Sequence, residues 1–109
     1  MFNIDNDTNT MTIIKKDTAS FKVALDNYFL KDGDKVVFTI AKEAEQPEPI
    51  KQIVVEDFYE GEATVLISSE DSNIEADTYL YDIQINTADG RVDTIVGPAK
   101  FKVIGGITY

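Results

Sequence analysis

Carboxylates are the side chains of this sequence with the most capacity for chemistry, because 20 of its 109 residues are Asp or Glu. Two carboxyl groups about 5–10 Å apart could cleave a glycosidic bond. The chain contains no His and no Cys, so Ser-His catalysis and thiol chemistry are excluded. So many acidic residues on a small surface also place some pair at that separation by chance. We therefore predict a solvated acidic surface and no enzyme, with no catalytic residue and no cofactor.

A second acidic pattern is typical of calcium binding. Asp5, Asp7 and Asn9 match the first ligand positions of a calcium loop, but Thr10 stands where the turn glycine belongs and Lys16 where the bidentate glutamate belongs. We interpret the segment as a polar turn without a metal site, and the alternative is weak calcium binding. Turn hydrogen bonds explain four other loop aspartates at least as well as calcium does: Asp32, Asp34, Asp71 and Asp77.

Aromatic side chains near predicted loops are candidates for a binding surface. Tyr28, Phe29, Phe58 and Tyr59 lie in or next to such loops, where exposed rings favour contact with a partner. The alternative is that they close the ends of the fold. Tyr109, which follows two glycines, is a further candidate for reaching a neighbouring subunit, unless the chain end frays.

Tyr79 has a structural interpretation instead. It begins a predicted strand just after the polar corner at residues 75–77. Sandwich folds keep a tyrosine at this place, and its hydroxyl donates to the backbone a few residues upstream. We predict that Tyr79 is such a tyrosine corner.

The composition predicts one folded domain over residues 1–109, of which 1–10 could form a flexible N-terminal segment. A hydrophobic share of 43% with 5 Tyr and 6 Phe supplies a core, and packing alone must stabilise it because no disulfide is available. The net charge of −10 repels phosphate groups, which makes nucleic acid and anionic membrane poor partners. The first residues show neither the basic region nor the apolar region of a signal peptide, and no apolar run has the length of a membrane span, so we expect synthesis in the cytoplasm.

Apolar residues alternate with a period of two through most of the chain, which predicts strands. Turn signals separate them at the spacing of a sandwich, and the sharpest is Asp89-Gly90. The predicted strands are residues 11–15, 20–25, 35–42, 50–56, 62–68, 78–87, 91–96 and 99–104. The fold class is therefore all-β, an immunoglobulin-like antiparallel β-sandwich of roughly seven to eight strands, with a meander at the end of the chain.

Two strands show which faces should be buried. In residues 35–42, Val36, Phe38 and Ile40 should face the core. In residues 78–87, four residues form the apolar face, namely Tyr79, Tyr81, Ile83 and Ile85, and the wet face carries Leu80, Asp82, Gln84 and Asn86.

Short motifs spread over nearly the whole chain, in order, carry a resemblance to a known family. They are Lys16-Asp17-Thr18 and the segments 21–25, 30–40, 76–85, 89–90, 94–95 and 101–103. With them the sequence resembles the N-terminal immunoglobulin-like domain of phage baseplate upper proteins and similar prophage tail-tip proteins of Gram-positive bacteria. Two departures are Lys16 and Asp77, where the family often has glycine, and they leave open a cellular sandwich module of similar shape.

The resemblance implies a virion structural protein of the tail baseplate that docks onto baseplate proteins or carries receptor-binding proteins. Its partners would be other phage tail proteins, and we also expect a homo-oligomer because open sheet edges can pair. The alternative is a bacterial cell-surface adhesion module that binds protein or glycan with help from calcium.

Overall fold

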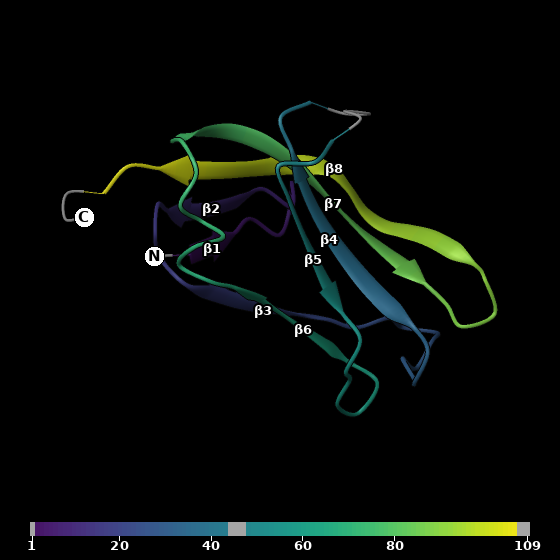
Figure 1. Cartoon of the computed structure of the whole chain (residues 1–109). Helices are drawn as coiled ribbons and strands as arrows, with labels where there is room; N and C mark the ends of the chain where they lie inside the picture. The colour runs from purple at the N-terminus through teal and green to yellow at the C-terminus, as the bar shows by residue number, and fades with distance from the viewer. Residues whose placement is uncertain (1, 44–47, 107–109) are drawn as a thin grey trace.

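The computed structural model describes residues 2–43 and 48–106, which form eight strands and no helix (Figure 1). The protein is therefore all-β, as the alternation predicts. The strands are β1 (Phe2–Ile4), β2 (Met11–Ile14), β3 (Ala19–Val23), β4 (Lys35–Ala41), β5 (Lys51–Val55), β6 (Ala63–Ile67), β7 (Asp77–Asn86) and β8 (Val92–Ile104).

The strands form two sheets. The larger has the order β1-β2-β8-β7-β4-β5, and the smaller pairs β3 with β6 (Figure 1). All pairs are antiparallel except β2 with β8, which run parallel from Met11 opposite Phe101 to Ile14 opposite Ile104. This pair joins the beginning of the chain to its end across one sheet.

One hydrophobic core contacts both sheets. Phe38 on β4 lies at its centre and is fully buried. Its ring packs against Phe21 on β3, with the centroids 5.4 Å apart and the rings at 73°, and against Phe101 on β8 at 6.0 Å. Edge-to-face contacts of this kind add to the free energy gained from burying apolar area. Phe21 therefore fastens the small sheet to the large one.

The predicted faces of the two central strands are confirmed. Val36, Phe38 and Ile40 are buried, with at most 1% of each exposed. The apolar face of β7 is buried too, and it consists of Tyr79, Tyr81, Ile83 and Ile85. The opposite faces of both strands contribute to the outer surface of the large sheet.

Two features of the sheet differ from the predicted strands. Residues 2–4 form β1 and pair with β2, where no strand was predicted. The predicted strands 91–96 and 99–104 are one strand, β8, so the predicted meander is wrong in its last step. Gly97 and Pro98 together face the single residue Asp82, a bulge between the pairs Tyr81↔Ala99 and Ile83↔Val96. Pro98 is tolerated because a bulge needs no ladder hydrogen bond at that point.

Candidate functional site

Tyr79 makes the contact that a tyrosine corner requires. Its hydroxyl donates to the carbonyl oxygen of Glu75 at 2.5 Å, and only 5% of the residue is exposed. Burial raises the pKa of Tyr79, and the nearby Asp77 carboxylate raises it further. Tyr79 therefore ties the start of β7 to the turn before it, and its ring is not available to a partner.

Replacing Tyr79 with Phe should lower the free energy of unfolding by about 1 kcal/mol, because the Glu75 carbonyl loses its donor. Urea denaturation at neutral pH measures the effect. Tyr59→Phe is the matched control, since 78% of Tyr59 is exposed, and it should leave stability unchanged. Equal stability of both variants and the parent chain would contradict the role of Tyr79.

The loop aromatics divide into two pairs. Tyr28 and Phe58 are half-buried and pack against the core, as the end-closing alternative expects. Phe29 and Tyr59 are 69% and 78% exposed, as the binding-surface interpretation expects. Tyr109 lies outside the described residues. We call Phe29 and Tyr59 the aromatic tip.

Hydrogen bonds to Asp34 orient the segment that carries Phe29. This buried carboxylate accepts hydrogen bonds from the Tyr28 hydroxyl at 2.8 Å and from the backbone N–H of Lys31 at 3.1 Å. Tyr28 is thereby drawn inward, and Leu30 is buried on the core. Phe29, between them, must face away from the core.

Tyr59 is exposed by a tight hairpin turn. The backbone N–H of Tyr59 donates to the Glu62 carbonyl and that of Glu62 to the Tyr59 carbonyl, both at 3.0 Å. Glu60 and Gly61, between them, both have positive φ, the geometry of the turn that suits a hairpin.

The two loops of the aromatic tip touch each other. A Cβ atom on Gly61 would lie 2.4 Å from the Phe29 ring, so the ring rests directly on this glycine. The backbone N–H of Leu30 also donates to the Gly61 carbonyl at 3.3 Å. Figure 1 shows the connections after β3 and after β5 at the same end of the molecule. Phe29 and Tyr59 therefore belong to one surface.

The calcium candidates near the N-terminus form a hydrogen-bonded turn. The Asp5 carboxylate accepts from the backbone N–H of Asp7 at 2.9 Å, and the Asp5 carbonyl accepts from the N–H of Asn9 at 2.7 Å. Among the residues described, no three Asp, Glu, His or Cys side chains are grouped so that they could hold a metal ion. The loop aspartate Asp34 likewise uses its oxygens for turn hydrogen bonds.

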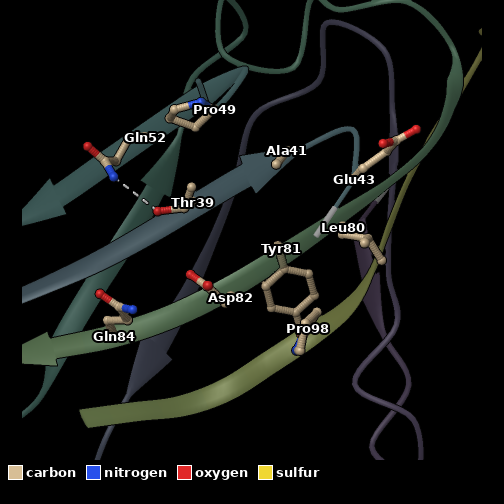
Figure 2. A pocket seen from close by; sticks show the side chains of 10 residues that line it. All are labelled: Thr39, Ala41, Glu43, Pro49, Gln52, Leu80, Tyr81, Asp82, Gln84 and Pro98. Carbon is tan, nitrogen blue, oxygen red and sulfur yellow. Dashed lines mark hydrogen bonds between the residues drawn. The ribbon is translucent and has the colours of Figure 1, made fainter. Parts of the chain in front are cut away.

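A hollow on the outer face of the large sheet was missed by sequence reasoning (Figure 2). It has a volume of ≈ 520 Å³, and its floor carries side chains from β5, β4 and β7, while the bulge in β8 forms one wall. The polar residues of the floor are Thr39, Gln52, Asp82 and Gln84. The wet face of β7 was predicted correctly, but the neighbours from β4 and β5 depend on a register that no local pattern reveals.

Asp82 is the unusual carboxylate of this hollow. It is half-buried, and burial alone raises its pKa. The pKa of Asp34, Asp77 and Asp89 is lowered instead, and each of these has a hydrogen-bond donor. Within the described part of the chain, no hydrogen bond or ion pair satisfies Asp82. A half-buried acceptor without a donor is a feature of ligand sites.

Comparison with known proteins gave no match. No protein-family model matches the chain. No curated protein and no solved structure is significantly similar to it. The described residues include no helix with the length and apolar character needed to cross a membrane.

Proposed function

We propose that this chain is an immunoglobulin-like sandwich that acts by binding other proteins, as a structural module of a phage or prophage tail baseplate. The strand order supports the fold: β8-β7-β4-β5 in one sheet and β3-β6 in the other follow the arrangement of immunoglobulin domains. The hydrogen bond from Tyr79 to Glu75 is a second supporting feature. The ordered motifs shared with baseplate upper proteins support the virion role.

The aromatic tip is the observation that carries the binding function. Two large rings with 69% and 78% exposure lie on touching loops, and aromatic rings are the residues that most often dominate an interface. Asp34 and the 59–62 hairpin hold the two loops in place. Little conformational entropy is then lost when a partner covers Phe29 and Tyr59, which favours affinity.

The negative charge around the aromatic tip indicates what kind of protein surface would bind it. Asp57, Glu60 and Glu62 lie within three residues of Tyr59 in the sequence, against the single basic residue Lys31 near Phe29, and the whole chain carries −10. Like charges oppose contact between two copies at this end. The tip therefore suits a different tail protein that offers an apolar pocket with Lys or Arg at its rim, and any homo-oligomer would use the sheet edges.

Co-expression with the products of the adjacent genes tests this function. At least one adjacent gene product should be a tail protein that forms a defined complex, measured by light scattering coupled to size exclusion. The double variant Phe29→Ala/Tyr59→Ala should weaken that complex at least tenfold, whereas Leu66→Ala, which removes an equally exposed side chain on β6, should not.

Two results would refute the proposal. One is a complex of unchanged affinity in the double variant, and the other is a gene neighbourhood without tail proteins. Calcium and chelator arms of the same light-scattering experiment address the alternative: a monomer whose stability rises with calcium would favour the cell-surface adhesion module.

A further inference from the structure

The floor of the outer hollow is a polar row that crosses three strands. Thr39 on β4 is paired in register with Gln52 on β5 and with Asp82 on β7. Adjacent strands lie about 4.8 Å apart, so the row is about 10 Å long. Figure 2 shows these side chains on the same side of the sheet, with Gln84 following Asp82 along β7.

The hydrogen bonds within the row leave both donors and acceptors for a ligand. The Gln52 amide donates to the Thr39 hydroxyl at 3.2 Å, and the Gln84 amide donates to the Thr94 hydroxyl at 3.4 Å. Each amide keeps a second N–H and a carbonyl oxygen. The Asp82 carboxylate adds acceptors that the described residues do not satisfy.

The walls of the hollow are mostly apolar, and Glu43 is the charged exception. Pro98 from the β8 bulge, Leu80 from β7 and Pro49 before β5 present C–H groups around the polar floor. A polar floor with apolar walls suits a ligand that has hydroxyl groups along its edge and C–H groups on its faces. The volume of ≈ 520 Å³ leaves room for one or two rings of that kind.

Charge restricts the class of ligand. The ionisable side chains that line the described part of the hollow are Glu43, Asp82 and the buried Tyr81, with no Lys or Arg among them, so an anion is repelled. A guanidinium or ammonium group could donate to Asp82. Such a cation carries no acceptor, however, for the amide N–H groups of Gln52 and Gln84. A hydroxyl group both donates and accepts, and it therefore matches the whole row.

We propose that this hollow is a binding site for a neutral sugar, with Asp82, Gln84, Gln52 and Thr39 as the residues that hydrogen-bond its hydroxyl groups. The site goes beyond the proposed assembly function, because it lies on the outer face of the large sheet and shares no residue with the aromatic tip. The chain would contact carbohydrate and protein through separate surfaces.

Nuclear magnetic resonance titration of the isotope-labelled chain tests the site. The probes are glucose, galactose and N-acetylglucosamine, each as the single sugar and as a β-1,4-linked trimer. At least one should shift the backbone signals of residues 39, 52, 82 and 84 and the side-chain amide signals of Gln52 and Gln84. Trimers that bind more tightly than single sugars would identify a polysaccharide as the source of the ligand, and equal affinity would identify a free sugar.

Asp82→Asn is the decisive variant. It keeps the size of the side chain but loses charge and acceptor strength, so sugar affinity should fall at least tenfold. Because burial raises the pKa of Asp82, removing the charge should leave stability at neutral pH equal or higher. If Asp82→Asn is as stable as the parent chain but binds sugar more weakly, the loss of affinity is not caused by unfolding. Asp7→Asn, at an exposed aspartate in the turn between β1 and β2, is the charge-matched control and should bind sugar normally.

Three outcomes would overturn the site. They are the absence of any shift with every sugar up to tens of millimolar, shifts that Asp82→Asn leaves unchanged, and shifts at the same residues with N-acetylarginine amide but with no sugar. None of them affects the complex formed through Phe29 and Tyr59, so failure of this site and failure of the assembly function are distinguishable.

Discussion

Replacing Asp34 with Ala is expected to lower the free energy of unfolding by about 3 kcal/mol. The carboxylate is 1% exposed and accepts three hydrogen bonds: from the Tyr28 hydroxyl at 2.8 Å and from the backbone N–H groups of Ala88 at 2.9 Å and Lys31 at 3.1 Å. Alanine leaves these donors without an acceptor. The loop before β4 would also lose its link to the turn between β7 and β8, and urea denaturation at pH 7 measures the total.

The same carboxylate makes stability depend on pH. Burial raises the pKa of Asp34, but the hydrogen bonds from Tyr28, Ala88 and Lys31 together outweigh it, so the pKa lies below its ordinary value of 3.8. A depressed pKa in the folded state contributes stability above pH 3.8 that is lost as the pH falls through the folded value. Asp34→Asn removes this titration, and its stability should decline less than that of the parent chain over the same acid range.

The control for Asp34 is Asp32→Ala in the same loop. Asp32 is exposed, so its removal should change stability by less than about 0.5 kcal/mol. A loss in Asp34→Ala that is no larger than in Asp32→Ala would refute the role of Asp34. Because the Asp34 network turns Phe29 outward, Asp34→Asn should in addition weaken the complex formed by the aromatic tip.

The central strands were predictable because burial on one face imposes a period of two on the sequence. Val36, Phe38 and Ile40 alternate with residues of the outer face, and Tyr79 opens the same pattern on β7. β1 carried no such signal, since its three residues become a strand only by pairing with β2. Local sequence contains the periodicity of a strand but not the pairing that stabilises a short one.

The continuity of β8 was not predictable for a related reason. Pro98 has no N–H to donate, and in isolation it indicates the end of a strand. Its effect depends on the partner strand, where Asp82 alone faces Gly97 and Pro98. The bulge thus accommodates Pro98 within the strand, and the bulge is seen only when the pairing with β7 is known.

The candidate sites were partly predictable. Sequence proximity to loops selected Tyr28 and Phe29 together, but only the hydrogen bond to Asp34 separates the inward ring from the outward one. Asp82 was assigned to the wet face correctly, yet only the register of three strands places it in one row with Thr39 on β4 and Gln52 on β5. A site whose residues come from several strands can be predicted only after the register of those strands is known.

Gly97 in β8 should be difficult to replace. Its φ of 132° lies where only glycine is comfortable, and a Cβ atom there would lie 2.4 Å from Asp82 Cβ and 2.9 Å from Asp82 Cα. The second distance involves backbone, so no side-chain rotation relieves it. Gly97→Ala must push β8 away from β7, and we expect it to lower the free energy of unfolding by about 3 kcal/mol.

Gly90 is the matched control, because it shares the positive φ without the close contact. Its φ is 94° and a Cβ atom at this position would meet no other atom within 4 Å, so Gly90→Ala should cost only about 1 kcal/mol. Urea denaturation of both variants separates backbone strain from the approach of Gly97 to Asp82. Equal losses would mean that the contact is not rigid. A larger loss at Gly97, accompanied by weaker sugar binding, would show that the close approach of Gly97 to Asp82 matters both for stability and for the position of Asp82 in the hollow.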